Sequence, residues 1–551
     1  MAENAFKADW PSFALGFNTG KSKGGGKPAE EKDVRFYDYD GTLLYSYTVE
    51  EAQKLTELPD LPTREGLTCQ GWNYDLATIK EYNGAVDVGA LYITDDGKTR
   101  FYITIDQDYR KLVRLYFCAT GEGAIIDWGD GSPTVTFSGN TSTYGSANHT
   151  YEAMGDYVIT LEPIGESVIT LGNPNSGNSD DYAPPVIGGR LLTGGSRVQN
   201  NMLRRAEIGK IGNVLPRQCF RENTNLETIN IPRGVTSTGT YTFSGCKSLR
   251  AVIIPDGFTT FGEYAFNDGA VGVLSLPDGV TSYGKYAFNR FKTRRLVFPS
   301  GMTSTYQYVF NESTIEELYV SNGVTRLNQY MFNQCTNLKK VSLPGSLATI
   351  YSYCFRSTAI EEIRIPNGIT SIEGYTFNGC KHLKTVILPD TVTNIGTYAF
   401  CACTSLESID IPNGVNTIGD YAFQSCPSLK SIDFPDGATV GKCTIASCTG
   451  LVEIELPEGM TSLSQNEFSG CNRLIVAKIP SSVATVGRYA FDTCISLLYV
   501  DFTKHEFVPT LSDSSLGSAS SDYQVRVPAA LVDEWKAATN WSSLASKIKG
   551  V

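Results

Sequence analysis

The sequence is poor in histidine, methionine and charge, and each shortage excludes a class of site. Its 551 residues include 3 histidines and 6 methionines, and charged residues make up 19%. With so few histidines and no Cys-x-x-Cys pair, neither a zinc site nor another metal or cofactor is expected. No apolar run is long enough for a membrane-spanning helix. The net charge of −12 argues against binding to nucleic acid or anionic lipid.

The N-terminus also lacks the features of a secretory signal. Its first residues, MAENAFKADWPSFALGF, contain no basic segment followed by an apolar core. If Met1 is the native start, we expect the protein to be made inside the cell and to leave it by another route.

What the chain has in abundance is a repeat. In its second half a phenylalanine returns every 22 or 23 residues, with one isoleucine in its place. A repeat of about this length with fixed apolar positions is typical of a solenoid of stacked coils. Solenoids offer an extended surface rather than a reactive pocket. The repeat positions are Phe220, Phe243, Phe266, Phe288, Phe310, Phe332, Phe355, Phe377, Phe400, Phe423, Ile445, Phe468 and Phe491.

One unit, LESIDIPNGVNTIGDYAFQSC at residues 406–426, shows how each coil is built. The pattern of Leu406, Ile409 and Ile411 suits a short strand with one face inward, and the following Pro-Asn-Gly ends that strand in a turn. This unit resembles the BspA-like leucine-rich repeat family. The resemblance covers residues 206–508 and implies a solenoid of short parallel strands.

Residues 31–113 are expected to form a first small domain. The segment VRFYDYDGTLLYSY at 34–47 indicates two strands around an Asp-Gly turn, and a second hairpin is expected around Asp96-Gly97. The stretch LPTREGLTCQGW at 61–72 resembles the internalin B-repeat family, a small β-grasp-like module of adhesive surface proteins.

Residues 114–163 are expected to form a second β module. The segment AIIDWGDGS at 124–132 is followed by HTY at 149–151 and GDYVITL at 155–161. These motifs resemble the PKD-type immunoglobulin-like (Ig-like) sandwich, which usually serves as a spacer or adhesion unit. The resemblance implies that Trp128 lies in the core and that Asp127 and Asp130 shape a turn. Calcium binding by these carboxylates is the alternative.

The remaining segments connect or close these modules. Residues 1–30 are expected to be an attachment segment and linker, with a disordered tail as the alternative. Residues 164–205, rich in Gly, Ser and Asn, are expected to be a connection. Residues 509–551 break the repeat and have helical spacing, so we expect a helical cap on the solenoid. The expected fold is therefore mainly β and multidomain. The candidate attachment residues are Trp10, Phe13, Leu15 and Phe17.

Cysteines recur at one position of the repeat. Eight of the 14 follow the repeat aromatic, or its isoleucine substitute, by three residues. A small buried apolar side chain would recur in this way. Disulfides between stacked coils are the alternative, but other residue types occupy the same position elsewhere, so we favour a ladder of buried thiols. These cysteines are Cys246, Cys335, Cys380, Cys403, Cys426, Cys448, Cys471 and Cys494.

No enzyme is expected. The pattern from Asp38 to Thr42, DYDGT, matches the nucleophile motif of haloacid-dehalogenase-like phosphatases. That chemistry needs a buried parallel strand and further acids from a larger domain, so we favour a hairpin turn. The three histidines lie in different modules, and no Ser-His-Asp or Cys-His pairing is indicated.

A row of tyrosines lies two residues before the repeat phenylalanine. We favour packing of these rings along the solenoid, with an aromatic binding surface as the alternative. The row comprises Tyr241, Tyr264, Tyr286, Tyr308, Tyr330, Tyr353, Tyr375, Tyr398, Tyr421 and Tyr489.

The variable position of each strand is the candidate for recognition. It lies between two inward apolar residues and is expected to face solvent, so packing leaves it free to specify a ligand. Solvated filler is the alternative. The candidate ligand-binding residues are Asn230, Ser275, Tyr319, Ser342, Arg364, Asp410, Asp433, Glu455, Lys478 and Asp501.

Every module resembles adhesive or structural proteins. Because no secretory signal is evident, we predict a bacteriophage virion structural protein: a tail, baseplate or head fibre. Its N-terminus would bind other virion proteins, and its solenoid would bind a host cell-surface protein or glycan. Chains could assemble as trimers, and the location would be the virion surface. The alternative is a bacterial cell-surface adhesin whose signal peptide was removed. A third hypothesis, a cell-wall-degrading enzyme, lacks a catalytic constellation.

Overall fold

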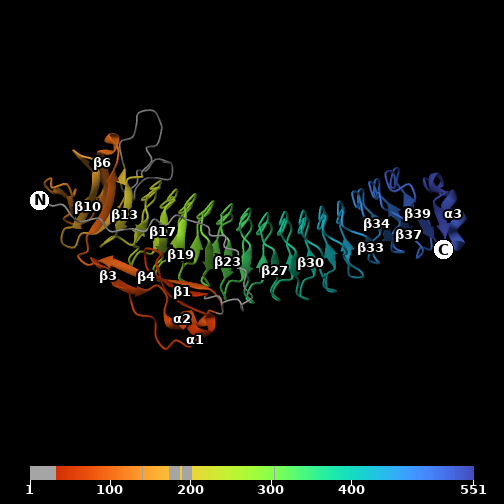
Figure 1. Ribbon diagram of the computed structural model, residues 1–551, viewed down its shortest axis with the longest axis horizontal. Coiled ribbons are helices and arrows are strands. Elements are labelled where there is room, and N and C mark those ends of the chain that lie inside the picture. Colours follow the sequence, from red (N-terminus) through yellow and green to blue (C-terminus); the bar gives the residue numbers. More distant parts are fainter. Residues whose placement is uncertain (1–32, 83, 139, 173–186, 189–200, 303) are drawn as a thin grey trace, which may run out of the picture.

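The computed structural model describes residues 33–551 except 83, 139, 173–186, 189–200 and 303. This part of the chain forms a long curved solenoid with two β units at its N-terminal end (Figure 1). The first unit lies against one side of the early coils, and the second continues the solenoid at its start. The prediction of a mainly β fold with a solenoid of parallel strands and a short terminal helix is confirmed.

The first unit is a four-stranded sheet in the order β2-β1-β4-β3 with two short helices. Strands β1 and β2 pair antiparallel around the Asp-Gly turn, where Gly41 has a φ of +88°. The DYDGT segment is therefore a hairpin turn, as favoured. Helix α1 begins with a capping box between Thr48 and Glu51. The elements are β1 Val34–Tyr37, β2 Leu43–Tyr47, α1 Val49–Gln53, β3 Leu67–Trp72, α2 Leu76–Glu81 and β4 Val86–Thr94.

The second unit contains β5, which sequence analysis assigned to the first domain. The hairpin expected around Gly97 is wrong: β4 pairs with β1 and β3 and not with β5, whose two edges are occupied by other strands. Strand β5 instead pairs with β10 and β13. One sheet has the order β15-β13-β5-β10-β7-β8, and in the other β6 pairs with β9, β11 and β12. The elements are β5 Thr99–Ile105, η1 Asp108–Arg110, β6 Leu112–Ala119, β7 Ala124–Asp127, β8 Val135–Phe137, β9 Asn140–Thr150, β10 Gly155–Pro163, β11 Ile169–Leu171, β12 Ile187–Gly188 and β13 Leu203–Glu207.

The aspartates of the second unit shape a turn, as the PKD-type resemblance implies. The Oδ1 atoms of Asp127 and Asp130 accept from the backbone N–H of Gly129 and Ser132 at 2.9 and 3.1 Å. Hydrogen bonds from Ser132 and then His149 lower the pKa of Asp130 to about 2. No group of three or more His, Cys, Asp or Glu side chains in the described part of the chain is arranged to hold a metal ion.

The solenoid carries two series of short parallel strands. The first series continues the sheet of the second unit, because β15 pairs parallel with β13. It comprises β15 Thr228–Ile229, β17 Leu249–Ile253, β19 Val271–Ser275, β21 Arg295–Phe298, β23 Glu317–Val320, β25 Lys340–Ser342, β27 Glu362–Arg364, β29 Thr385–Ile387, β33 Glu453–Glu455, β35 Val476–Lys478, β37 Tyr499–Asp501, β39 Gln524–Val527 and β40 Ile548–Gly550. The last two belong to the region expected as a cap, which therefore extends the sheet as well as closing it.

In each coil, the strand of the second series follows the strand of the first series along the chain, after a turn. It comprises β14 Val214–Leu215, β16 Ser237–Thr238, β18 Thr260–Phe261, β20 Ser282–Tyr283, β22 Ser304–Thr305, β24 Arg326–Leu327, β26 Thr349–Ile350, β28 Ser371–Ile372, β30 Asn394–Ile395, β31 Thr417–Ile418, β32 Thr439–Val440, β34 Ser462–Leu463, β36 Thr485–Val486 and β38 Thr510–Leu511.

The repeat phenylalanines form the core. All of them are fully buried, and neighbours from Phe220 to Phe423 stack with ring centroids 4.9–5.9 Å apart. Each ring packs against the same ring of the next coil, so burial of one depends on the register of both. Full burial of a side chain of this size contributes roughly 1.5–3 kcal/mol.

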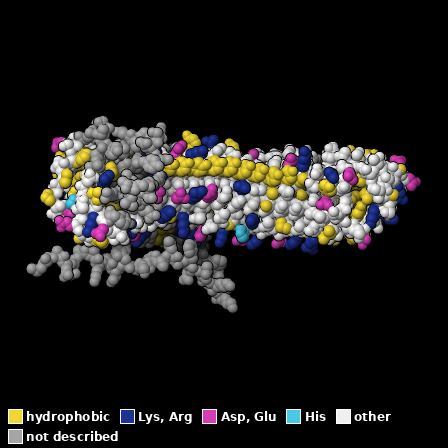
Figure 2. All heavy atoms as spheres, turned by 90° about the horizontal axis from the view of Figure 1, so that it is seen from above, with side chains coloured by type: hydrophobic (Ala, Val, Ile, Leu, Met, Phe, Trp, Pro, Cys, Tyr) yellow, Lys and Arg dark blue, Asp and Glu magenta, His cyan; other side chains and the backbone are white. Residues whose placement is uncertain are grey.

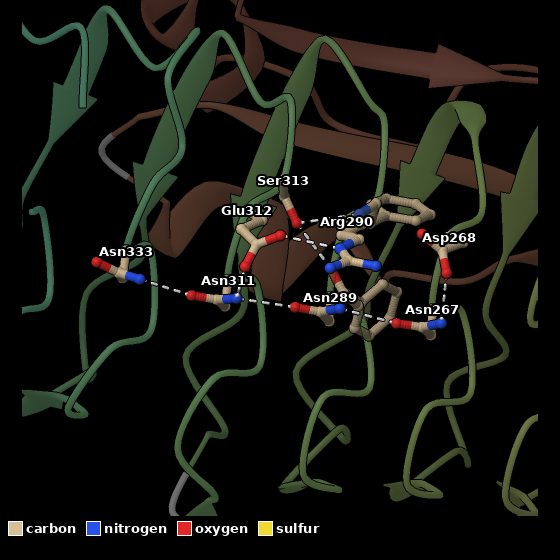
Figure 3. A network of polar contacts seen from close by, with 10 residues as sticks. Asn267, Asp268, Asn289, Arg290, Asn311, Glu312, Ser313 and Asn333 are labelled. Atoms are coloured by element: carbon tan, nitrogen blue, oxygen red, sulfur yellow. Dashed lines mark hydrogen bonds and ion pairs between the residues drawn. The ribbon is translucent and has the colours of Figure 1, made fainter. Parts of the chain in front are cut away.

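Asparagines form a second ladder beside this core (Figure 3). The Nδ2 atom of each asparagine donates to the Oδ1 atom of its counterpart in the preceding coil, at 2.7–2.9 Å, from Asn333 through Asn311 and Asn289 to Asn267. Because a buried amide without a partner costs about 1–3 kcal/mol, this ladder holds neighbouring coils in one register.

The row of tyrosines is a stack, as favoured. From Tyr241 to Tyr421 successive rings lie 4.4–5.1 Å apart and within 24° of parallel. Figure 2 shows a stripe of hydrophobic side chains that is continuous over part of the solenoid, as expected for such a stack. All these tyrosines have φ between 54° and 65°, which costs roughly 1–2 kcal/mol each. Stacking of about 0.5–1.5 kcal/mol per pair offsets much of that cost.

The cysteine ladder consists of thiols. All fourteen cysteines are free. In each of the eight repeat cysteines the buried Sγ donates to the carbonyl of the repeat residue in the preceding coil, as Cys335 does to Phe310 at 3.2 Å. At the equivalent position Ser313 makes the same bond to Phe288. Burial raises the pKa of Cys335 to about 12, so the thiol is a poor nucleophile.

The C-terminal end is closed by aromatic side chains around His505. The cap contains η2 Ala529–Leu531, helix α3 Val532–Ala537 and η3 Trp541–Leu544. Trp535 and Trp541 are buried against each other and against Phe502, whose ring also contacts His505. The Nε2 atom of His505 lies 3.1 Å from the Val483 carbonyl.

The asparagine ladder gives the first prediction. Asn311→Ala removes the amide that links Asn289 to Asn333, so we expect it to destabilise the solenoid by about 1–3 kcal/mol. Asn337→Ala makes the same change at an exposed position one coil away and is expected to cost less than about 0.5 kcal/mol. Chemical denaturation of both variants measures the difference, and equal midpoints would show that the ladder contributes nothing to stability.

The cap gives a second prediction. Burial lowers the pKa of His505, against hydrogen bonds to Val483 and Phe502 and the charge of Glu458, which raise it. Protonation therefore destabilises the folded cap. The contribution of the neutral imidazole to stability is fully present above the unfolded-state pKa of about 6.5. It is lost as the pH decreases toward the folded-state pKa. Thermal unfolding at pH 7.5 and 5 should show a larger acid-induced drop for the wild type than for His505→Gln. Parallel drops would contradict this assignment.

Candidate functional site

The variable positions of the first strand series form one continuous row. The strand registers align Tyr319 with Ser342, Glu455 with Lys478, and Lys478 with Asp501. Residues on each side of these positions point into the core, as Leu318 and Val320 do around Tyr319. The row is therefore the outward side of the sheet, as sequence analysis expected. We call this surface the strand face.

The first unit covers the beginning of the strand face. The expectation that Asn230, Ser275 and Tyr319 face solvent is wrong, since they are 2%, 0% and 7% exposed. The Nδ2 atom of Asn230 donates to the Tyr92 carbonyl at 2.9 Å, and Ser275 donates to the carbonyl of Asp87. These contacts come from strand β4.

The cover is well packed. Ile253 and Ala251 form a small apolar cluster with Leu91, and Val297 and Tyr319 join the hydrophobic core of the first unit. At Gly89 an added Cβ would lie 2.3 Å from Ile253, so only glycine allows this approach.

Polar bonds surround this apolar contact. Arg233 donates to the Gln70 and Trp72 carbonyls at 2.6 and 3.2 Å, and its backbone N–H donates to the Gln70 side chain. The Tyr82 hydroxyl donates to Asp278 at 2.5 Å. The covered part of the strand face thus has an apolar centre with a polar rim.

Beyond the first unit the strand face is open. The other seven candidate residues are exposed or half-exposed, and they are Ser342, Arg364, Asp410, Asp433, Glu455, Lys478 and Asp501. Lys478 lies 2.7 Å from Glu453 and 3.4 Å from Glu455. A hydrogen bond from Lys504, and then the bond and charge of Lys478, lower the pKa of Glu455. The open part therefore presents a charged, chemically varied row.

The tyrosine stack offers less for recognition than its composition suggests. Between Tyr241 and Tyr421 each ring covers a face of its neighbour, so within the stack only edges and hydroxyls reach solvent. The first ring, Tyr241, is covered by the Arg221 guanidinium at 4.7 Å. Stacking on a flat ligand requires a free ring face, which this arrangement does not provide.

Some functional residues escaped sequence analysis. Ile253 and Val297 occupy the same outward position as the candidate residues, and apolar side chains there are the signal that something covers them. The candidate attachment residues Trp10, Phe13, Leu15 and Phe17 lie outside the described residues.

Comparison with known families identifies the repeat. The family described as "BspA type Leucine rich repeat region" matches six copies, at residues 210–335, 270–384 and 370–498, which together span more than half of the chain. A search of curated proteins found no match.

Several solved structures are similar to the chain. A leucine-rich repeat protein from Bacteroides ovatus is 24% identical with a TM-score of 0.46, and the match covers 54% of this chain and 81% of that one. A leucine-rich cell surface protein from Faecalibacterium prausnitzii is 27% identical with a TM-score of 0.33, and the match covers 52% of this chain and 86% of that one. A leucine-rich repeat protein from Eubacterium ventriosum is 20% identical with a TM-score of 0.41, and the match covers 59% of this chain and 91% of that one.

The glycine contact tests the cover. Gly89→Val would force Ile253 away, so we expect the first unit to detach from the strand face and amides of β17 and β19 to exchange hydrogen at least about tenfold faster. Gly84 has open space around it, so Gly84→Val should leave both the attachment of the first unit and the exchange of these amides unchanged. Hydrogen exchange read by mass spectrometry compares the variants. Unchanged protection of β17 and β19 in Gly89→Val would show that the contact is not tight.

Proposed function

The chain belongs to the BspA-type leucine-rich repeat family, and from this premise we propose that it is a non-enzymatic cell-surface adhesin. The similar protein from Faecalibacterium prausnitzii is described as a cell surface protein, and solenoids of this kind present extended binding surfaces. The ligand would be a protein or glycan of another cell, and the open part of the strand face would bind it.

One observation carries this proposal. From Ser342 to Asp501 the strand face holds exposed side chains of both charges, on a backbone that the buried ladders keep in register. Packing does not dictate these side chains, because they point away from the core while the residues on either side of them are buried or packed against it. A rigid, extended row of this kind is suited to a large partner.

The small β units fit the same role. We interpret residues 33–94 and the sheets that follow as adhesive-type modules of the β-grasp-like and PKD-like kinds. The turn at Asp127 and Asp130, and the burial of Trp128, support the second resemblance.

The comparisons favour the adhesin over the phage virion protein that sequence analysis preferred. The virion hypothesis, its N-terminal attachment and the trimer stay predictions. In the described residues no helix is long and apolar enough to cross a bilayer.

Charge swaps on the strand face test the proposal. Arg364→Glu/Asp410→Lys keeps the net charge but reverses the pattern on the open part of the row, so binding should fall about tenfold or more. The matched control, Arg326→Glu/Asp513→Lys, makes the same swap beside the second strand series and should bind as the wild type does.

Flow cytometry with fluorescently labelled protein on epithelial and bacterial cells measures this binding. Equal loss in both variants, or in neither, would contradict recognition by the strand face. Binding confined to bacterial cells, with the protein co-purifying with phage particles, would favour the virion hypothesis instead.

A further inference from the structure

A cleft lies between the first unit and the solenoid, apart from the open part of the strand face. Its volume is about 650 Å³, and pockets that bind ligands usually measure about 300–1,000 Å³. One wall is the loop between α1 and β3 with the segment from Gly71 to Thr78, and the other is formed by the turns that follow β15, β17 and β19. We call this space the junction cleft.

Hydrogen bonds fix both walls of the junction cleft. Trp72 is buried, and its Nε1 atom donates to the Pro59 carbonyl at 3.0 Å, which anchors the loop. The Nδ2 atom of Asn73 donates to the Ile254 carbonyl at 2.9 Å, which ties the same wall to the solenoid. Because the walls are held in place before any ligand arrives, binding requires little ordering of the protein.

The junction cleft already holds one guanidinium group. Arg233 lines it from the first of the three turns, and its Nε atom lies 2.9 Å from Asp256. Its other nitrogens donate to the carbonyls of Gln70 and Trp72. Gly71, between those two residues, has a φ of +108°, and an added Cβ would lie 3.6 Å from the guanidinium. Arg233 therefore shows that the walls of the cleft supply acceptors suited to a cation.

Further carboxylates line the cleft without a cation to balance them. Glu57 and Asp60 are exposed, and their side chains form no hydrogen bond or ion pair with another residue in the described part of the chain. Asp75 and Asp278 also line the cleft, whereas Arg233 is the one basic residue among the described residues that does so.

Basic residues close by in the sequence do not supply that balance. Lys54 lies 2.6 Å from Glu50, and Arg64 lies 2.7 Å from Asp38, so both are paired away from the cleft. Lys80 of α2 does not line it. The junction cleft therefore favours a positively charged occupant.

Apolar side chains beside these carboxylates restrict the shape of that occupant. Leu58 and Leu61 line the cleft next to Glu57 and Asp60, and Leu61 is 46% exposed. An arginine or lysine side chain joins an apolar stem to a charged head, which suits acidic and apolar groups that lie side by side. The volume of the cleft exceeds that of one such side chain, so it accommodates a segment of several residues.

We propose that the junction cleft binds a segment of a partner protein that carries arginine or lysine next to apolar side chains. This site goes beyond the proposed function, because it is separate from the open part of the strand face. Since its walls belong to the first unit and to the solenoid, an occupant would bridge them and hold the first unit in place.

Removal of two carboxylates tests the site. Glu57→Gln/Asp60→Asn changes exposed residues of a loop without helix or strand, so the variant should fold as the wild type does. The matched control, Glu506→Gln/Asp513→Asn, makes the same changes at exposed positions near the other end of the solenoid. Fluorescence anisotropy follows binding of the full chain to a short labelled peptide with two arginines and two leucines, and to the same peptide with citrulline in place of arginine.

The arginine peptide should bind, with a dissociation constant at least about tenfold higher for Glu57→Gln/Asp60→Asn and unchanged for the control. The citrulline peptide should bind at least about tenfold more weakly. No binding, equal binding of the two peptides, or the same dissociation constant in both variants would overturn the proposal. Displacement of the peptide by an equal concentration of spermine, which has charge but no apolar side chains, would also overturn it.

Hydrogen exchange separates binding across the junction from binding elsewhere. With the arginine peptide at about 100 times its dissociation constant, amides of β17 and β19 should exchange at least about tenfold more slowly, because the first unit detaches less often. Unchanged exchange would place the peptide outside the cleft and overturn the proposal. Arg364→Glu/Asp410→Lys should bind the peptide as the wild type does. Weaker binding by that variant would place the peptide on the strand face instead.

Discussion

In-register stacking of identical side chains is the constraint on which the rest of this molecule depends. Phenylalanine, tyrosine and asparagine each meet their own kind in the next coil, and each repeat cysteine donates to the carbonyl of the repeat phenylalanine or isoleucine in the preceding coil. A shift of one residue would separate all four ladders at once. Because each contact is made only when its neighbours are made, register is cooperative, and the strand face inherits a rigidity that a single coil could not supply.

Stacking also explains a costly feature of the backbone. Tyrosine rarely adopts a left-handed conformation, yet every tyrosine in the stack does so. A lone ring would gain little in return for this strain, whereas a ring between two others gains two contacts. The stack includes Tyr398 and ends at Tyr421. In the next two coils Cys443 and Asn466 take the tyrosine position and keep the same left-handed conformation.

The two ends of the solenoid have different neighbours. At the start, β13 joins the first coil to the sheet of the second unit, so the first strand series continues into that sheet and does not end in a free edge there. At the other end, two further parallel strands, β39 and β40, are covered by the aromatic cluster around Trp535. Between these ends the first unit divides the strand face into a covered and an open part.

The features set by the repeat could be predicted from the sequence, whereas the contacts between separate modules could not. The phenylalanine spacing predicted the coils, and the recurrence of Cys246 and its counterparts predicted buried thiols. The cover over Ser275 was missed because its partner, Asp87, lies 188 residues away in the chain, and no local pattern reports such a contact. The error at Gly97 has the same origin, since strand pairing depends on which edges other strands have already filled.

Two serines at the same position of the repeat provide the most direct test of this division. Ser275 is buried under the first unit and Ser342 is exposed. Each is changed to cysteine in the full chain, and the rate of maleimide labelling at that site is measured by peptide mass spectrometry. The account predicts rapid labelling of Ser342→Cys and protection of Ser275→Cys. Equal rates at the two sites would contradict it.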